Sequence, residues 1–262
     1  SNGDVVIENV KMFADTEHAA HYPVHFWTES NLAESGTPIT KSALVKDCYV
    51  EYVDAIASVV EKGIVIENTE FVCISQSTGR SLFAPESTAY SNNGTHVLRN
   101  CSFSAPVDIG TMTTYRKTIF ENCSFDCPAN NINFSTGNEC KFKGCNFSVK
   151  CLYFSGTNLL PVFFEDCRII ATSYAVYLGR DYSVEFVNCY FEGNNGGFSS
   201  LRSAGTFVFI GCRGTNKHVS KRFNDDGSVT TGTYKLYNCV FPDLTFRTGG
   251  ASLVEHNTVW AG

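Results

Sequence analysis

Short runs in which apolar and polar residues alternate recur along the whole chain. In the best-kept copy, Ile119–Phe125, the apolar Phe120 is followed by Glu, Asn, Cys, Ser and Phe. Because successive side chains of a strand point to opposite faces, this pattern predicts short β-strands with one apolar face. No stretch keeps a helical period over about 11 residues, so the pattern favours an all-β protein.

The copies follow one another at a nearly constant interval. The cysteine of each unit marks that interval, and successive cysteines are 22, 22, 22, 22 and 23 residues apart. The cysteines are Cys101, Cys123, Cys145, Cys167, Cys189 and Cys212. A fixed period of this length is typical of one small unit stacked on copies of itself. With weaker copies near both ends, we expect about eleven rungs of a single-stranded parallel β-helix, right-handed because parallel crossovers almost always are.

Three positions of the unit have predictable roles. The residue before the cysteine is always Asn, Asp or Gly in these copies, and these residues tolerate left-handed backbone dihedrals, so we expect a one-residue corner there. The cysteine and the residues three before and two after it are expected to point into the core. A second alternating run in most units, such as Ile132/Phe134 and Leu152/Phe154, predicts a further strand.

The repeat favours one elongated domain over residues 1–262. We expect an irregular first rung with an insertion at residues 1–47 and a longer loop between late rungs at residues 213–238. Because an open end of a β-helix exposes backbone and core, the segment is expected to belong to a longer chain, or to have its ends covered by partner subunits.

The chain contains 12 cysteines, most of them at one repeat position. Strands lie about 4.8 Å apart, whereas a disulfide needs Cβ atoms about 3.8 Å apart, so bonding along the stack is disfavoured. We therefore expect reduced, buried thiols, consistent with assembly in a reducing cytosol. The remaining cysteines lack metal-ligand spacing with histidines, and we expect no metal and no cofactor.

Bulk composition excludes some partners. The net charge of −6 provides no basic stripe for nucleic acid, and no apolar run is long enough to cross a membrane.

The repeat unit resembles that of the pectate-lyase-like superfamily of right-handed parallel β-helices, and most closely that of bacteriophage tailspikes and receptor-binding proteins. The resemblance implies a virion or extracellular location and a homotrimer. It also implies a domain that binds bacterial surface polysaccharide. Two alternatives stay open, a polysaccharide lyase or glycoside hydrolase on the same scaffold, and a passive structural shaft. Outward apolar residues at Val187, Ile210 and Tyr237 likewise indicate a surface covered by subunits or by other parts of a longer chain.

Two features are candidates for ligand binding. Arg168, Tyr190 and Arg213 occupy the position after the cysteine on consecutive units, and they predict a strip of aromatic faces and guanidinium donors that suits a sugar. Trp27, which alternation places outward, is a second candidate platform.

Catalysis is weakly indicated. Glycoside hydrolysis needs two carboxylates about 5–9.5 Å apart. Asp126 and Glu192 share one repeat position but lie three turns apart, roughly 14 Å. Asp181, Asp225 and Asp226 lie in expected loops without an identifiable partner.

Overall fold

A computed structural model gives the arrangement of the chain. The structure describes residues 3–14, 23–26, 40–53, 56–57, 60, 62–75, 81–83, 94–107, 109, 111–114, 116–136, 139–154, 161–173, 175–178, 183–193, 198–200, 206–214, 233–242 and 252–261.

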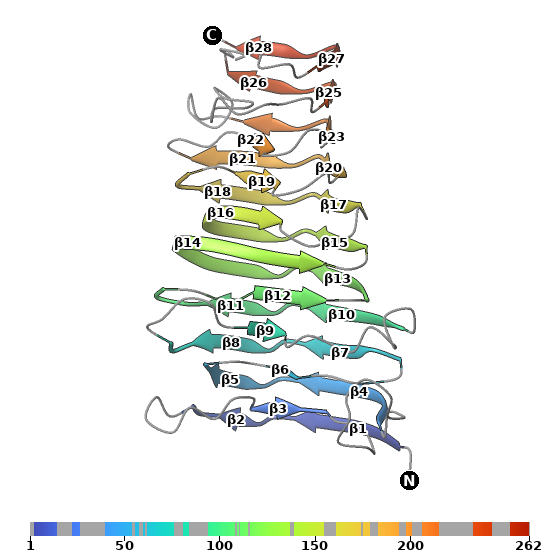
Figure 1. Cartoon of the computed structure of the whole chain (residues 1–262), viewed down its shortest axis with the longest axis vertical. Helices are drawn as coiled ribbons and strands as arrows, with labels where there is room; N and C mark the ends of the chain where they lie inside the picture. Colours follow the sequence, from blue (N-terminus) through green and yellow to red (C-terminus); the bar gives the residue numbers. More distant parts are fainter. Residues whose placement is uncertain are drawn as a thin grey trace.

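The described chain is a column of parallel strands that rises from the N-terminal end to the C-terminal end (Figure 1). Every strand pair is parallel and joins segments that lie far apart in the sequence, which is the pattern of a β-solenoid. The prediction of an all-β parallel coil is therefore confirmed. Its handedness stays a prediction.

One sheet of the solenoid takes one strand from each winding of the chain. Its eleven strands are β1 (Gly3–Glu8), β4 (Thr40–Lys46), β7 (Ile64–Glu67), β10 (Thr95–Arg99), β13 (Lys117–Glu121), β15 (Cys140–Lys143), β17 (Val162–Glu165), β20 (Ser183–Val187), β23 (Thr206–Ile210), β25 (Thr233–Tyr237) and β27 (Ser252–His256).

The second sheet contains the strands that follow the corner, and in several turns a further strand beyond it. Its members are β2 (Lys11–Met12), β3 (Val24–His25), β5 (Tyr49–Tyr52), β6 (Ile56–Ala57), β8 (Glu70–Cys73), β9 (Ser81–Phe83), β11 (Ser102–Ser104), β12 (Thr111–Thr114), β14 (Ser124–Thr136), β16 (Asn146–Phe154), β18 (Arg168–Ala171), β19 (Val176–Leu178), β21 (Tyr190–Gly193), β22 (Phe198–Ser200), β24 (Arg213–Gly214), β26 (Val240–Pro242) and β28 (Val259–Ala261).

The expected count of eleven rungs needs a correction. The 22-residue repeat holds for about six turns, from β10 to β23. Outside this part, side chains in contact across neighbouring strands are 38 residues apart at Glu8 and Lys46, and 19 apart at Thr233 and Ser252. The regular solenoid is shorter than predicted because connections of unequal length separate the outer strands.

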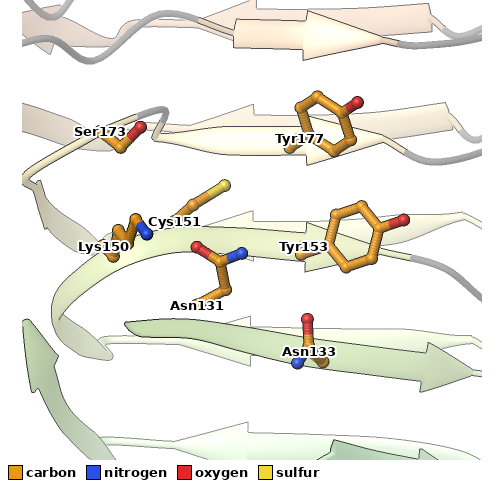
Figure 2. A pocket seen from close by; sticks show the side chains of 7 residues that line it. All are labelled: Asn131, Asn133, Lys150, Cys151, Tyr153, Ser173 and Tyr177. Carbon is orange, nitrogen blue, oxygen red and sulfur yellow. The ribbon is translucent and has the colours of Figure 1, made fainter. Parts of the chain in front are cut away.

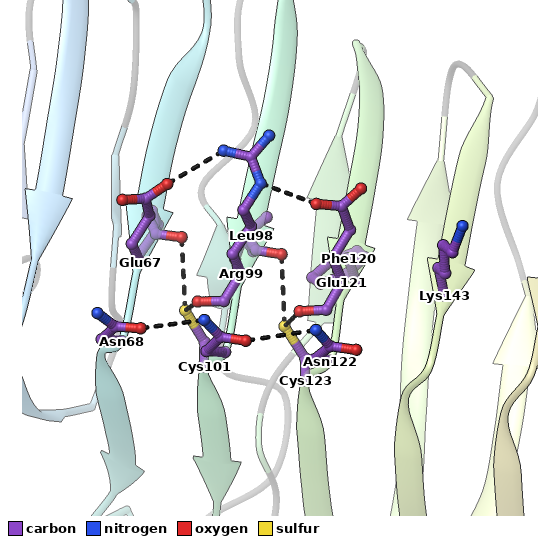
Figure 3. Close-up of polar contacts among 12 residues, drawn as sticks. Glu67, Asn68, Leu98, Arg99, Cys101, Phe120, Glu121, Asn122, Cys123 and Lys143 are labelled. Atoms are coloured by element: carbon purple, nitrogen blue, oxygen red, sulfur yellow. Dashed lines mark hydrogen bonds and ion pairs between the residues drawn. The ribbon is translucent and has the colours of Figure 1, made fainter.

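Each turn bends at a single residue, as the sequence predicted. Non-glycine corner residues have φ between 48° and 58°, and Gly144 and Gly211 have φ of 62° and 63°. Asn side chains stack at this corner, and the Asn100 amide donates to Asn68 Oδ1 at 3.1 Å (Figure 3). Asn tolerates this left-handed conformation and gains a hydrogen bond from the turn beside it.

The core contains a stack of phenyl rings, one from each successive turn. The centroids of Phe120 and Phe142 lie 4.8 Å apart, and the stack continues through Phe164, Phe186 and Phe209 at 4.8–5.0 Å. These distances match the spacing of about 4.8 Å between neighbouring strands, so identical side chains on successive turns pack face to face.

The repeat cysteines are buried, and all twelve cysteines of the chain are free thiols, as expected. In each regular turn the thiol points toward a backbone carbonyl of the preceding turn. Cys123 Sγ lies 3.5 Å from the Leu98 oxygen (Figure 3). Cys145 Sγ lies 3.5 Å from the Phe120 oxygen. Contact with the Cys123 and Cys167 thiols, together with burial, raises the pKa of Cys145 far above its ordinary value. The stacked thiols act as small core residues, each with a weak donor that points at a carbonyl oxygen.

The outer face of the eleven-stranded sheet carries paired charges. Arg99 donates to Glu67 at 3.0 Å and to Glu121 at 2.8 Å, and both glutamates lie on neighbouring strands (Figure 3). Val187, Ile210 and Tyr237, which continue this column, are half-buried. No helix in the described residues is long and apolar enough to cross a membrane.

Candidate functional site

Outward side chains of three consecutive turns form a column on the second sheet. Asn133 on β14 pairs with Tyr153 on β16, and Tyr153 pairs with Tyr177 on β19. Their strand neighbours Ile132, Leu152 and Val176 are fully buried, so alternation holds the column on the outside. Figure 2 shows the two tyrosines one above the other, with Asn133 below them.

The turn that contains β16 passes its corner in fewer residues than the neighbouring turns do. Six steps along the chain separate Ser148 from Phe154. Eight steps separate the residues paired with them in the turn below, Asp126 and Phe134, and eight separate Ile170 and Leu178 in the turn above. The next turn toward each end of the solenoid also takes eight steps, from Ser104 to Met112 and from Glu192 to Ser200.

The shortened corner explains a recess in the outer surface. The turns below and above β16 take two more residues past this corner than the turn that contains β16. The register shift between Cys127 and Asn131 on β14 marks the extra residues of the turn below. The resulting pocket has a volume of about 360 Å³ and is lined by Asn131, Asn133, Lys150, Cys151, Tyr153, Ser173 and Tyr177 (Figure 2).

The walls of the pocket are aromatic and amide groups. The ring centroids of Tyr153 and Tyr177 are 5.2 Å apart, and the ring planes are inclined by 35°. Asn131 and Asn133 add side-chain amides from the turn below, and amides both donate and accept hydrogen bonds. The backbone of Ser173 is fixed by its N–H, which donates to the Lys150 oxygen at 2.9 Å.

The base of the pocket is neutral and its rim is cationic. The Cys151 side chain is almost completely buried, and burial raises the pKa of its thiol to about 12, so the thiol is uncharged at neutral pH. Lys150 is exposed and forms no ion pair with another described residue. No acidic residue is among the lining residues that the structure describes.

The predicted strip on the second sheet is in register. Tyr190 on β21 pairs with Arg168 on one side and with Arg213 on the other. The Arg168 guanidinium is already engaged, because it lies 2.8 Å from Glu192 Oε2 and 5.8 Å from the centre of the Tyr190 ring. The arrangement of the strip is confirmed, and its role in ligand binding stays a prediction.

The described catalytic candidates are not brought together. Asp126 and Glu192 are separated by two intervening strands, through the register Asp126, Ser148, Ile170 and Glu192. This is three strand spacings, roughly 14 Å, which exceeds the separation used in glycoside hydrolysis. Glu192 is also held in the ion pair with Arg168.

Other predicted residues lie outside the described part of the chain. These are Trp27, Asp181, Asp225 and Asp226. The same holds for much of the predicted insertion at residues 1–47 and of the long loop at residues 213–238. In the described residues, no group of three or more His, Cys, Asp or Glu side chains is placed to hold a metal ion.

The pocket itself was missed by the sequence analysis. Its signal is present in the second alternating run, whose outward positions are Asn133, Tyr153 and Tyr177. The shortened corner is hidden, because the cysteines keep their 22-residue spacing across it. The eight steps from Phe154 to Val162, against six from Phe134 to Cys140, restore the two residues that the corner lacks.

Comparison with known proteins gives no relative for this chain. No family model matches it, and neither the curated proteins nor the solved structures provide a significant match. The geometry of the described residues therefore carries the functional argument.

Proposed function

We propose that this chain is a right-handed β-helix domain of a virion fibre or tailspike-like receptor-binding protein, and that its side surface binds bacterial surface polysaccharide. The repeat unit, which resembles that of tailspikes, supports the class of protein. The recess at the β16 corner supports polysaccharide as the class of ligand. The proposed domain works as part of a homotrimer or of a longer chain, outside the cell or on a virion.

The observation that carries the proposal is the pair of tyrosines over a recess rimmed with amides. Sugars present C–H faces that pack on aromatic rings, and hydroxyls that exchange hydrogen bonds with amide groups. A volume of about 360 Å³ lies within the range of about 300–1,000 Å³ that is typical of ligand pockets. The pocket is open at the surface, which suits one or two units of a long polymer.

Binding without turnover is favoured over hydrolysis at this site. Glycoside hydrolysis uses two carboxyl groups as acid and as base or nucleophile. The described lining residues provide none, and the candidate carboxylates Asp126 and Glu192 lie three strand spacings apart. A lyase or hydrolase at this recess would need carboxyl groups that its described lining residues do not provide.

The test is an array of purified bacterial capsular polysaccharides probed with the wild-type chain and with Tyr153→Ala and Tyr177→Ala. We expect binding to some polymers, weakened about five- to tenfold by each substitution through the loss of aromatic contact. Tyr190→Ala is the matched control, because Tyr190 is a half-buried tyrosine of the same sheet outside the pocket.

Three results would contradict the proposal. Loss of binding in Tyr190→Ala alone would move the site to the Arg168–Tyr190–Arg213 strip. New reducing ends or unsaturated products from the bound polymers would make the chain an enzyme. If no polymer binds, the passive shaft is the better account.

A further inference from the structure

We propose that the recess selects polysaccharides that carry an anionic substituent, and that Lys150 is the residue that recognises it. This inference rests on the proposed function, because it names the class of glycan taken by the same pocket. The shared chemistry is a carboxylate or phosphate group on a sugar unit, as in uronic acids, pyruvate ketals or phosphodiester-linked polymers.

The charge of the pocket differs from that of the whole chain. The chain has a net charge of −6, so an anionic polymer is repelled by the protein as a whole. Within the recess the described lining residues include one cation and no anion. An anionic group therefore finds a locally favourable position there.

Lys150 is free of the ion pairs that engage some of the other described lysines. Lys141 lies 2.8 Å from Glu165, Lys117 lies 2.7 Å from Glu139, and Lys46 lies 3.1 Å from Glu8. Lys150 forms no ion pair with any described residue, and its ammonium group keeps three donors for a ligand.

Lys150 also lies in the shortened corner itself. The residue lies between the start of β16 and Cys151, at the point where the turn is two residues shorter than its neighbours. The neighbouring Cys151 thiol does not compete as an anion, because burial raises its pKa to about 12. Asn131, paired with Cys151, places an amide donor on the adjacent strand beside the same opening (Figure 2).

The experiment uses capsular polysaccharides of known composition, neutral, uronate-bearing, pyruvylated and phosphate-bearing. We expect the bound polymers to be the anionic ones, with binding weakened as ionic strength rises from about 0.05 to about 0.5 M. Lys150→Gln is expected to weaken binding about tenfold, through loss of a charge-assisted hydrogen bond. Lys150→Arg should restore most of it, and the uronate and phosphate arms identify the preferred anion.

The matched control is Lys235→Gln, which removes the same charge from a half-buried position on the other sheet. Equal losses in Lys150→Gln and Lys235→Gln would overturn the inference, because net charge alone would then explain them. Binding restricted to neutral polymers would also overturn it and leave the proposed function standing. Binding to no polymer would remove the proposed function itself.

Discussion

The two outward surfaces of the solenoid differ in how their polar groups are used. On the eleven-stranded sheet, Glu67, Arg99 and Glu121 pair with one another from turn to turn. At the β16 corner, Lys150 has no charged partner among the described residues, and the tyrosines line a hollow. The strands that carry Glu67, Arg99 and Glu121 pair without a register shift, and the second surface lies where one turn is two residues shorter. The difference teaches that charges in register on neighbouring strands satisfy one another, whereas the shortened turn places a cation in a recess whose described lining has no acidic side chain.

The interior of the regular part should be the most sensitive region. Phe142→Ala removes a fully buried ring stacked on Phe120 and Phe164, and we expect a loss of about 3–5 kcal/mol in the free energy of unfolding. Phe163→Ala, one residue along the same strand and outward, should cost less than half as much. Urea unfolding followed by circular dichroism measures both, and equal losses would contradict the inward stack.

The corner is the next most sensitive position. Asn122 has φ of 53°, so Asn122→Ala should cost about 1–2 kcal/mol through the strain of a left-handed β-carbon. Asn122→Gly should cost less, because glycine already occupies the corner at Gly144 and Gly211. The same urea experiment ranks the two variants, and a less stable glycine variant would show that hydrogen bonding, and not backbone strain, dominates the corner.

Alkaline pH should test whether the Cys151 thiol at the base of the recess is buried. Burial raises the pKa of Cys151 from 9.0 to about 12, so its thiol favours the folded state fully below pH 9. As pH rises above 9 the unfolded thiol ionises first, and stability falls by about 1 kcal/mol from this group by pH 10. Urea unfolding at pH 7, 8, 9 and 10 should show a smaller fall in Cys151→Ala than in the wild type. An identical fall in both would mean that the Cys151 thiol is not buried.

The smallest expected changes in the free energy of unfolding come from substitutions on the two outward surfaces. Arg99→Ala should lower the free energy of unfolding by about 0.5 kcal/mol at low salt, because exposed ion pairs contribute little. Lys150→Ala should leave stability unchanged, since Lys150 has no ion pair to lose among the described residues. A larger loss from Lys150→Ala than from Arg99→Ala would show that Lys150 has a structural role.

The repeating part of this molecule could be predicted from the sequence, because each position of the unit has one physical requirement. The corner requires a residue that tolerates positive φ, and Asn, Asp or Gly stands there each time. The core positions require a ring or thiol that stacks at the strand spacing, as Phe142 and Cys145 do. These constraints are local, and they are visible without a relative.

The recess could not be predicted in the same way, because it arises from a difference between turns. The cysteine spacing is unchanged where the corner loses two residues and the following connection regains them. Only the pairing of Phe134 with Phe154, and of Phe154 with Leu178, reveals the shift. The outer strands were overcounted as regular rungs for a related reason, since corner residues persist there while the spacing between them varies.

One measurement tests most directly whether the short corner makes the binding site. Two residues inserted between Lys150 and Cys151 give this turn the same eight steps as the turns on either side. The account predicts a chain with nearly wild-type unfolding free energy that has lost polysaccharide binding at least tenfold. An insertion variant that folds and binds as tightly as the wild type would contradict the account, because the hollow would then be irrelevant to recognition.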